Sequence, residues 1–491
     1  MKKLVRLLIL LGIIGGGAEL WRRQSESGDI VSSVDSLGRN ATVAGMGART
    51  GSRWAVTQAR KTFASAERRD ELDAEFELKT TEDVVASLGN LKGAMMKVGQ
   101  MASYLDTGLP ENVRQTLAQL QTDAPPMSGE LAASVVLEEL GQHPREVFAE
   151  WDPVPIASAS IGQVHRALTH DGQAVAVKVQ YPGVGEAIES DLKTNDAIFG
   201  GLRMMFPGID TATITEELRE RLSEELDYEL EARNQQHFAD HFDGHPFIHV
   251  PHVITKYSSS KVLTSELVVG AKFDEVMKWP QQEKDLAAET LFRFTFGSIY
   301  RLAAFNGDPH PGNYLFHKGG RVTFLDFGLV KHFDSSDTAL FESLITNMVL
   351  DIDYPAFRKT IEDAGLLQPG QPFSDEVIGQ YFSYFYDFVL HDREYTFDED
   401  YAQAGVKAIF ETGGEFGELK KTLNVPASFV VLQRINLGVI SLFAQLEATN
   451  NWRRVAEELW PFVGASPSTP MGHTIARWGR ASRRRTEYQG L

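Results

Sequence analysis

Cysteine is absent from this 491-residue chain, and positively charged side chains are scarce. The absence of cysteine excludes disulfides, thiolate metal sites and cysteine nucleophiles. Lysine and arginine number 48 against 67 aspartate and glutamate residues, which gives a formal net charge of -19. Nonspecific binding of nucleic acid needs a basic surface for the phosphates, so this balance argues against a nucleic-acid partner. Hydrophobic residues make up 43% and charged residues 23%, as in an ordinary globular protein.

Hydrophobic periodicity and turn residues predict an order of helices and strands along the chain. A helical pattern precedes residue 150, an alternating strand pattern follows, and helical patterns return towards the C-terminus. The expected elements are a helix over 131–140, strands over 160–168 and 174–180, a charged helix over 214–238, a strand over 261–269, an apolar helix over 286–305, short strands over 314–316 and 322–325, and helices throughout 339–463.

Lys178 follows a Val-Ala-Val sequence on the second strand of a predicted β-hairpin, whose turn is the Asp-Gly pair at 171–172. This pattern is typical of the kinase strand whose lysine reaches the α- and β-phosphates of ATP. A rigid strand suits that task because the cation must reach the phosphates without moving. A four-residue match also arises by chance, so a surface lysine on a strand edge is the alternative.

Two acidic motifs follow Lys178 in the order found in kinases. Asp308 lies five residues before Asn313, the spacing of the Asp and the metal-binding Asn in a kinase catalytic loop. Asp326 begins an Asp-Phe-Gly sequence 18 residues after Asp308, and its carboxylate would ligate magnesium. Such residues are also common in ordinary turns. The order and spacing of the three motifs favour ATP binding, with Asp308 and Lys178 as catalytic residues and Asn313 and Asp326 as Mg²⁺ ligands.

The glycine-rich phosphate loop of protein kinases, Gly-x-Gly-x-x-Gly, is missing ahead of Lys178. Ala157, Ser158, Ala159 and Ser160 take its place. Small residues still let the backbone approach a nucleotide, but alanine adopts positive φ less freely than glycine. We therefore expect the phosphates to be held differently from those in an ordinary protein kinase.

Together with these motifs, the segment from Lys97 to Gln100 resembles the Lys-x-Gly-Gln signature of the UbiB/ADCK/AarF family of atypical kinase-like proteins. Residues 157–160 are similar to the alanine-rich loop of that family, with Ser158 where alanine is commoner. The segment from Glu225 to Asp227 is similar to its Glu-x-Asp motif.

The resemblance implies roles that spacing alone leaves open. Several acidic residues between 224 and 231 are candidates to hold Lys178, and the resemblance implies that Glu231 does so while Glu225 contacts Lys97. It also implies that the adenine of ATP meets the backbone of a hinge segment formed by Ser265, Glu266, Leu267 and Val268. Regulatory roles are implied for Lys97, Gln100, Glu225 and Asp227.

The fold implied by the resemblance is α+β, a protein-kinase-like fold of two lobes with a helical N-terminal extension and a helix-rich C-lobe. The domain boundaries that we expect follow the motifs. They are a hydrophobic membrane anchor or signal-like segment (1–24), a linker with surface helices (25–80), a helical extension with the Lys-x-Gly-Gln motif (81–150), an N-lobe (151–270), a C-lobe (271–465) and a basic tail (466–491).

The resemblance also implies cofactors and an activity. ATP or ADP and Mg²⁺ would be bound by an atypical ATPase or phosphotransferase that serves isoprenoid quinone or other membrane lipid metabolism. In the family, the Lys-x-Gly-Gln segment lies across the site where a kinase receives a protein substrate, which disfavours ordinary protein phosphorylation. Two alternatives are a small-molecule phosphotransferase of the aminoglycoside-kinase type and a nucleotide-sensing scaffold without turnover.

The two ends of the chain are basic and differ in this from the acidic body. The apolar run over 7–14 is shorter than the roughly 18 to 20 residues that span a bilayer. We interpret it as a membrane anchor or interfacial helix, with a cleaved export signal and a buried helix as alternatives. Export would separate an ATP-using enzyme from ATP. We expect a cytoplasmic protein that contacts the membrane surface through its N-terminus and basic tail, with a membrane lipid or isoprenoid quinone precursor as partner.

Overall fold

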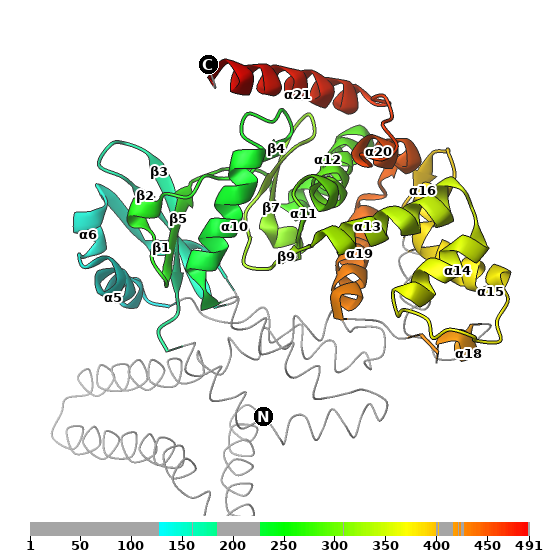
Figure 1. The fold of residues 1–491 in the computed structure, drawn as a ribbon. Coiled ribbons are helices and arrows are strands. Elements are labelled where there is room, and N and C mark those ends of the chain that lie inside the picture. Colours follow the sequence, from blue (N-terminus) through cyan, green and yellow to red (C-terminus); the bar gives the residue numbers. More distant parts are fainter. Residues whose placement is uncertain are drawn as a thin grey trace, which may run out of the picture. The chain divides into compact units, whose positions relative to one another are not determined.

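The computed structural model describes residues 127–159, 161–183, 226–307, 309–398, 401, 416–420, 422–423 and 427–489, all within one compact unit, Gly89–Leu491. Figure 1 shows a four-stranded sheet with helix α10 (Tyr228–His241) beside it. The rest of the described chain is built mainly of helices. The predicted α+β class is confirmed. The segments 1–24 and 25–80 and most of 81–150 lie outside the described residues, so the domain boundaries stay predictions.

The first sheet is antiparallel, with the strand order β1-β2-β3-β5. Its strands are β1 (Glu150–Ser158), β2 (Gly162–Leu168), β3 (Ala174–Gln180) and β5 (Val262–Glu266). The predicted hairpin at 171–172 joins β2 and β3, with Gly172 in the left-handed region at a φ of 85°. Strand β5 is shorter than the predicted 261–269, because the ladder with β3 ends where Glu266 pairs with Val175.

The two faces of this sheet bury different side chains. Val175, Val177 and Val179 alternate along β3 and are fully buried against helix α5 (Gly129–Leu140), which confirms the helix predicted over 131–140. Helix α10 (Tyr228–His241) lies on the opposite face, where Leu263 packs against its first residue, Tyr228. Because side chains alternate along a strand, Lys178 lies on the α10 face. Only the part of the predicted helix 214–238 from residue 226 onward is described.

Strand β1 was not among the predicted elements, because Pro153 and Pro155 interrupt its pattern. Proline cannot donate a ladder hydrogen bond and is tolerated on edge strands and at bulges. Strand β1 is at the edge of the sheet, and its register with β2 shifts on both sides of Pro155. The edge position therefore explains a strand that sequence periodicity did not indicate.

The helical part is organised around α12 (Gln281–Arg301), which differs from the predicted helix 286–305. The helix ends at Arg301, with Leu302 as its C-cap. Ala303 then adopts a φ of 46°, and Phe305 lies in strand β6 (Ala304–Asn306) instead. Strand β6 pairs with β9 (Val330–His332), and local periodicity does not show such a pairing between segments that are distant in the sequence. The predicted short strands are confirmed as the hairpin of β7 and β8, and β4 adds to β8 in parallel. These strands are β4 (Ile248–His249), β6 (Ala304–Asn306), β7 (Tyr314–His317), β8 (Arg321–Phe324) and β9 (Val330–His332).

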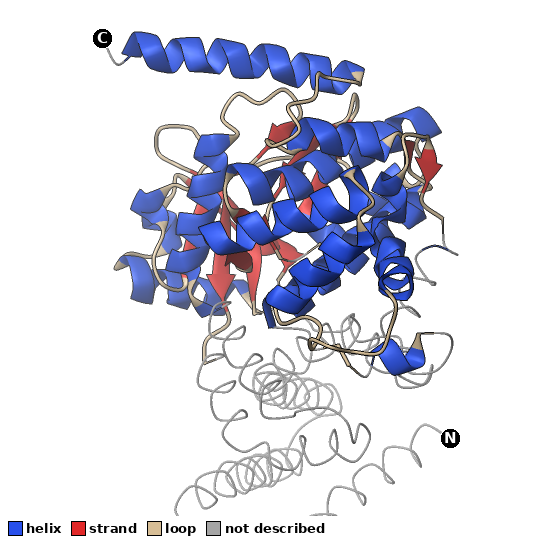
Figure 2. Cartoon of the chain, turned by 45° about the vertical axis from the view of Figure 1, so that its right-hand side comes forward, coloured by secondary structure: helices blue, strands red, loops and turns tan. Residues whose placement is uncertain are grey.

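Helices make up most of this part of the molecule (Figure 2). They pack around α12 in a core rich in phenylalanine, as expected for the described part of 339–463. Trp452 is completely buried there and stacks on Phe443 at a ring separation of 5.4 Å. The remaining elements are α6 (Pro144–Val147), η1 (Thr255–Tyr257), α11 (Phe273–Val276), η2 (Pro311–Asn313), α13 (Ser335–Ile345), η3 (Thr346–Leu350), α14 (Tyr354–Asp363), α15 (Asp375–Ser383), η4 (Tyr384–Tyr386), α16 (Asp387–Leu390), β10 (Tyr395–Thr396), α18 (Gly417–Lys420), α19 (Ala427–Leu446), β11 (Thr449–Asn450) and α20 (Trp452–Leu459).

The basic tail forms helix α21 (Pro470–Gln489), which runs past the β4 and β7 region in Figure 1. A buried ion cluster holds the segment that leads into it. Arg293 of α12 lies 2.8 Å from Glu289 and 2.9 Å from Glu458 of α20, and it donates to Thr469. Among the residues that the structure describes, no helix combines the length and the apolar character needed to cross a bilayer.

His245, in the loop after α10, packs against Trp478 of α21 with their ring centres 4.7 Å apart. Its Nδ1 accepts hydrogen bonds from the backbone N–H groups of Phe247 and Ile248. Burial lowers the pKa of His245 from 6.5 to about 3, and the charges of Arg301 and Arg293 act in the same direction. A proton on Nδ1 would also remove both backbone hydrogen bonds. The folded protein therefore excludes a proton that the unfolded chain takes up below pH 6.5.

We predict that the free energy of unfolding falls as the pH drops from 6.5 towards 3, partly because His245 resists protonation. In His245→Asn the amide oxygen still accepts hydrogen bonds but no longer titrates, so the fall should be shallower. Urea denaturation at pH 7 and pH 4.5 measures this slope, with the exposed His391→Asn as control. Equal slopes for all three proteins would contradict the assignment.

Candidate functional site

Lys178 is held between two carboxylates that come from distant parts of the chain. Its Nζ donates to both Oε1 and Oε2 of Glu231, each at 2.8 Å, and lies 3.6 Å from Oδ2 of Asp326. The side chains of Lys178, Glu231 and Asp326 are 17%, 2% and 31% exposed. Nζ also lies 5.0 Å from the centre of the Tyr228 ring. The sheet, α10 and the segment after β8 thus each contribute one charged group.

The position of Glu231 follows from the start of α10. Asp227 is the N-cap of this helix, and its Oδ1 accepts from the backbone N–H of Leu230. The cap fixes the residue at which the helix begins. Tyr228 and Glu231, three residues apart, then lie one turn apart on its buried face. Glu229 is 62% exposed and belongs to the solvated face. Among the described acidic residues of this stretch, burial therefore distinguishes Glu231 from Asp227 and Glu229.

Asp326 lies in a backbone turn that two side chains outside the predicted set hold in place. Its own Oδ1 accepts from the N–H of Gly328, and its carbonyl oxygen accepts from the amide of Asn306 at 2.7 Å. Asn234 of α10 donates to the carbonyl oxygen of Phe327, whose ring is fully buried. Asn234 and Asn306 were missed from the sequence, because an asparagine within a helix or at the end of a strand gives no signal of the distant carbonyl that it binds.

The electrostatics of the cluster favour a charged lysine. Burial alone would lower the pKa of Lys178, but Asp326 and Glu231 outweigh it, and the pKa is raised well above its ordinary value of 10.5. The lysine thus keeps its charge at neutral pH. A fixed ammonium group beside a half-buried carboxylate is suited to bind phosphate oxygens and a metal ion together.

Asn313 and Asp326 are adjacent through the backbone. The carbonyl oxygen of Asn313 accepts from the N–H of Leu325, the residue before Asp326. An amide oxygen and a carboxylate are hard oxygen ligands that suit Mg²⁺. Within the described ranges, no three His, Asp or Glu side chains form a metal cage. Mg²⁺ needs none, because it is usually held by one or two carboxylates together with substrate phosphates. The donor set therefore fits this metal.

The described part of the alanine-rich segment, residues 157–159, ends β1 and leads into the turn before β2. Ala157 and Ser158 end β1 opposite Val164 and Gln163, and the N–H of Ala159 donates to the carbonyl oxygen of Gly162. This turn lies at the end of β3 just past Lys178, because Gly162 pairs with Gln180.

Gly162 was not predicted to matter, although its position explains why glycine is needed there. A Cβ at Gly162 would collide with the carbonyl oxygen of Val179 and come within 2.8 Å of the Tyr228 hydroxyl. Glycine therefore permits the close approach of the turn, β3 and α10 around Lys178.

The predicted hinge segment lies on the strand next to Lys178. Ser265 and Glu266 end β5 opposite Ala176 and Val175, and the N–H of Leu267 donates to the carbonyl oxygen of Ala174. Val268 follows and is half-buried. The segment is thus near the cluster, while its contact with adenine stays a prediction.

The structure tests only part of the predicted site. It brings together Lys178, Glu231 and Asp326, and their roles in nucleotide binding stay predictions. Asp227 lies within the described residues, where it caps helix α10, and its regulatory role stays a prediction. The predicted residues outside the described part of the chain are Lys97, Gln100, Ser160, Glu225 and Asp308.

Comparisons with known proteins show which proteins the chain is similar to. The ABC1 atypical kinase-like domain family matches residues 119–360. The probable serine/threonine-protein kinase abkD of Dictyostelium discoideum is 32% identical over 52% of this chain and 38% of its own length. The mitochondrial atypical kinase COQ8 of Saccharomyces cerevisiae is 29% identical over 57% of this chain and 56% of its own length. The chain thus spans 38% and 56% of the lengths of these two curated relatives.

A solved structure extends the likeness to the fold. Rv3197 from Mycobacterium tuberculosis, in its complex with erythromycin, is 32% identical with a TM-score of 0.58. The match covers 81% of this chain and 100% of that one.

We predict that Lys178 and Glu231 are strongly coupled in stability. Lys178→Met leaves a buried carboxylate without its partner and should lower the free energy of unfolding by about 3 kcal/mol. The double variant Lys178→Met/Glu231→Leu should lose less than the sum of the two single variants, by about 1–3 kcal/mol. Urea denaturation of the four proteins at pH 7 gives this coupling energy.

The exposed pair of Lys359 and Asp363 is a matched control, because its atoms are 2.6 Å apart but its side chains are 76% and 67% exposed. The same double-variant cycle there should give a coupling below about 0.5 kcal/mol. Additive losses at Lys178 and Glu231 would show that their contact does not stabilise the fold.

Proposed function

We propose a function from the premise that this chain belongs to the UbiB/ADCK/AarF family of atypical kinase-like proteins. It binds ATP or ADP with Mg²⁺ and acts as an atypical ATPase or phosphotransferase. The observation that carries the proposal is the position of Lys178, fixed on a strand between the buried Glu231 and the carboxylate of Asp326. This is the arrangement that a phosphate-binding lysine and a metal-binding aspartate require.

Each residue of the cluster has a distinct task in this proposal. Glu231 holds the ammonium group of Lys178 in one place, so that the phosphates meet a preorganised cation. Asp326 and Asn313 would hold Mg²⁺, which neutralises charge on the phosphates when it is bound. Asn234 and Asn306 fix the backbone around Asp326 through the carbonyl oxygens of Phe327 and Asp326. Asp308 would orient the nucleophile.

The substrate class that we propose is a membrane lipid or an isoprenoid quinone precursor. Two considerations support it: the family resemblance, whose members are associated with coenzyme Q and other isoprenoid lipids, and the similarity to the atypical kinase COQ8 of yeast. The protein would meet its substrate at the membrane surface, through residues 1–24 and the arginine-rich helix α21. A nucleotide-sensing scaffold would share the binding site but lack turnover.

Nucleotide binding is tested with variants of the cluster. Asp326→Asn keeps the shape of the side chain and removes a metal ligand, so the gain in ATP affinity that Mg²⁺ provides should fall by more than about tenfold. Lys178→Ala should weaken ATP binding with or without the metal. Calorimetric titration in Mg²⁺ and in EDTA measures both effects, with Asp363→Asn on the exposed face of α14 as a matched control.

Turnover is measured separately, as phosphate release with and without anionic liposomes, and Asp308→Asn serves as the blank. Hydrolysis like that of the wild type in both Asp326→Asn and Lys178→Ala would remove the site assignment. Binding without hydrolysis above the blank would instead favour the sensing scaffold.

Membrane association is tested by deletion of residues 1–24. The deleted segment contains the apolar run and five basic residues, so its loss should release the protein from vesicles that contain anionic lipid. Cosedimentation of the full chain and the deletion variant measures the bound fraction. If the deletion variant sediments as fully as the full chain, the first 24 residues are not the anchor.

A further inference from the structure

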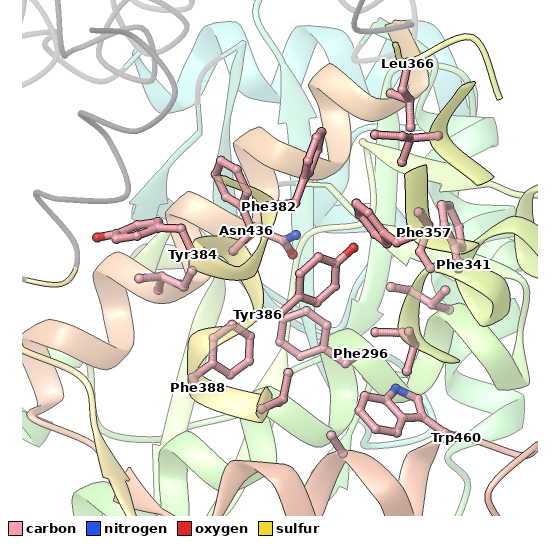
Figure 3. Close-up of a pocket in the computed structure, with 18 of the residues that line it drawn as sticks. Phe296, Phe341, Phe357, Leu366, Phe382, Tyr384, Tyr386, Phe388, Asn436 and Trp460 are labelled. Atoms are coloured by element: carbon pink, nitrogen blue, oxygen red, sulfur yellow. The ribbon is translucent and has the colours of Figure 1, made fainter. Parts of the chain in front are cut away.

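The helical part contains an aromatic cavity that shares no residue with the Lys178 cluster. Its volume is about 300 Å³, and its walls come from α12 and from the helices packed around it, α13, α14, α15, α16, α19 and α20 among them. One stretch of chain, 381–388, contains six aromatic side chains in eight residues and supplies most of one wall. Figure 3 shows Phe296, Phe357, Phe382 and Tyr386 around this space.

The packing of the wall distinguishes this cavity from an ordinary core. Protein interiors are close-packed, with few voids larger than a water molecule. Here several large side chains next to the fully buried core, Phe296, Phe382, Phe385 and Tyr386 among them, keep accessible surface. Burial nevertheless raises the pKa of the Tyr386 phenol. The accessible surface of Tyr386 therefore faces an internal space lined by protein.

The wall is mainly apolar, its polar groups are tyrosine phenols, Lys420 and one amide, and the amide has an acceptor that is unpaired within the described part of the chain. Asn436 of α19 lines the cavity, and its Oδ1 is buried without a hydrogen-bond partner among the described residues. Buried polar atoms of native proteins are nearly always paired, with protein groups, water or a ligand. The amide of Asn436 is directed among the aromatic rings in Figure 3. An unpaired acceptor in an apolar cavity is the arrangement that recognises a donor on a lipophilic molecule.

We propose that this cavity is a second ligand site, which takes a lipophilic molecule with an aromatic or similarly flat body and one hydroxyl group that donates to Asn436 Oδ1. The size of the body follows from the volume, because an engineered cavity of about 150 Å³ holds one benzene ring. A cavity of about 300 Å³ therefore has room for roughly two fused rings. The cavity shares no residue with the Lys178 cluster, so the inference stands whether or not the chain turns over ATP.

The probes for this site are 2-naphthol and its methyl ether, 2-methoxynaphthalene. They share a two-ring body, but only the naphthol can donate a hydrogen bond. Calorimetric titration of the full chain without nucleotide should show one saturable site for 2-naphthol, with the ether bound roughly tenfold more weakly. In Asn436→Leu the two probes should bind with equal affinity, because the acceptor is gone.

A filled cavity gives the second test. Ile440 lines the space and is partly accessible, so Ile440→Trp should abolish binding of both probes. Leu137→Trp, at an exposed position of α5, adds the same side chain away from the cavity and should bind as the wild type does.

Three outcomes would overturn the proposal. They are no saturable binding of 2-naphthol to the wild type, equal affinities of the wild type for the two probes, and binding that Ile440→Trp leaves unchanged. The comparison of the two probes on the wild-type protein needs no variant, so it decides the question even if a substitution prevents folding.

Discussion

The ion cluster of Lys178, Glu231 and Asp326 is the constraint on which the arrangement of the sheet, α10 and the Asp-Phe-Gly turn depends. Taking charges out of water is costly, and the cost is offset only when the partners are in place with good geometry. The bidentate contact of Lys178 with Glu231 at 2.8 Å meets this condition. A displacement of any of the three elements would leave a buried charge without its partner.

One face of helix α10 contacts both Lys178 on the sheet and the backbone and ring of Phe327 next to Asp326. Glu231 holds Lys178, Asn234 holds the carbonyl oxygen of Phe327, and Phe238 packs on the Phe327 ring with their centres 5.0 Å apart. Successive turns of a rigid helix thus position the cation of Lys178 and the carboxylate of Asp326 relative to each other. Such preorganisation lets polar groups stabilise charge without rearrangement when a substrate binds.

The unit combines this polar cluster with a separate aromatic cavity, and the two have opposite physical character. The cluster is built from buried charges that satisfy one another, whereas the cavity is lined mainly by apolar side chains, with the amide of Asn436, tyrosine phenols and Lys420 as its polar groups. A protein that joins phosphate chemistry to a lipophilic ligand needs both environments, because neither can accommodate the other's ligand. Helix α12, at the centre of the helical core, lines the cavity and leads into β6, whose Asn306 holds the backbone of Asp326.

The sequence by itself determined the kinase-like class, the hairpin that carries Lys178 and the order of the charged motifs, because local alternation, turn residues and motif spacing are written along the chain. It did not reveal strand β1, because two prolines interrupt the pattern of this edge strand. It also did not reveal the end of α12 at Arg301, since the following strand β6 pairs with the distant strand β9. The family resemblance implied Glu231, and the tertiary structure showed its burial and its contact with Lys178. Only the tertiary structure identified Asn234, Asn306 and the Asn436 cavity, through their surroundings. Burial and convergence are properties of the packed molecule, and no local pattern encodes them.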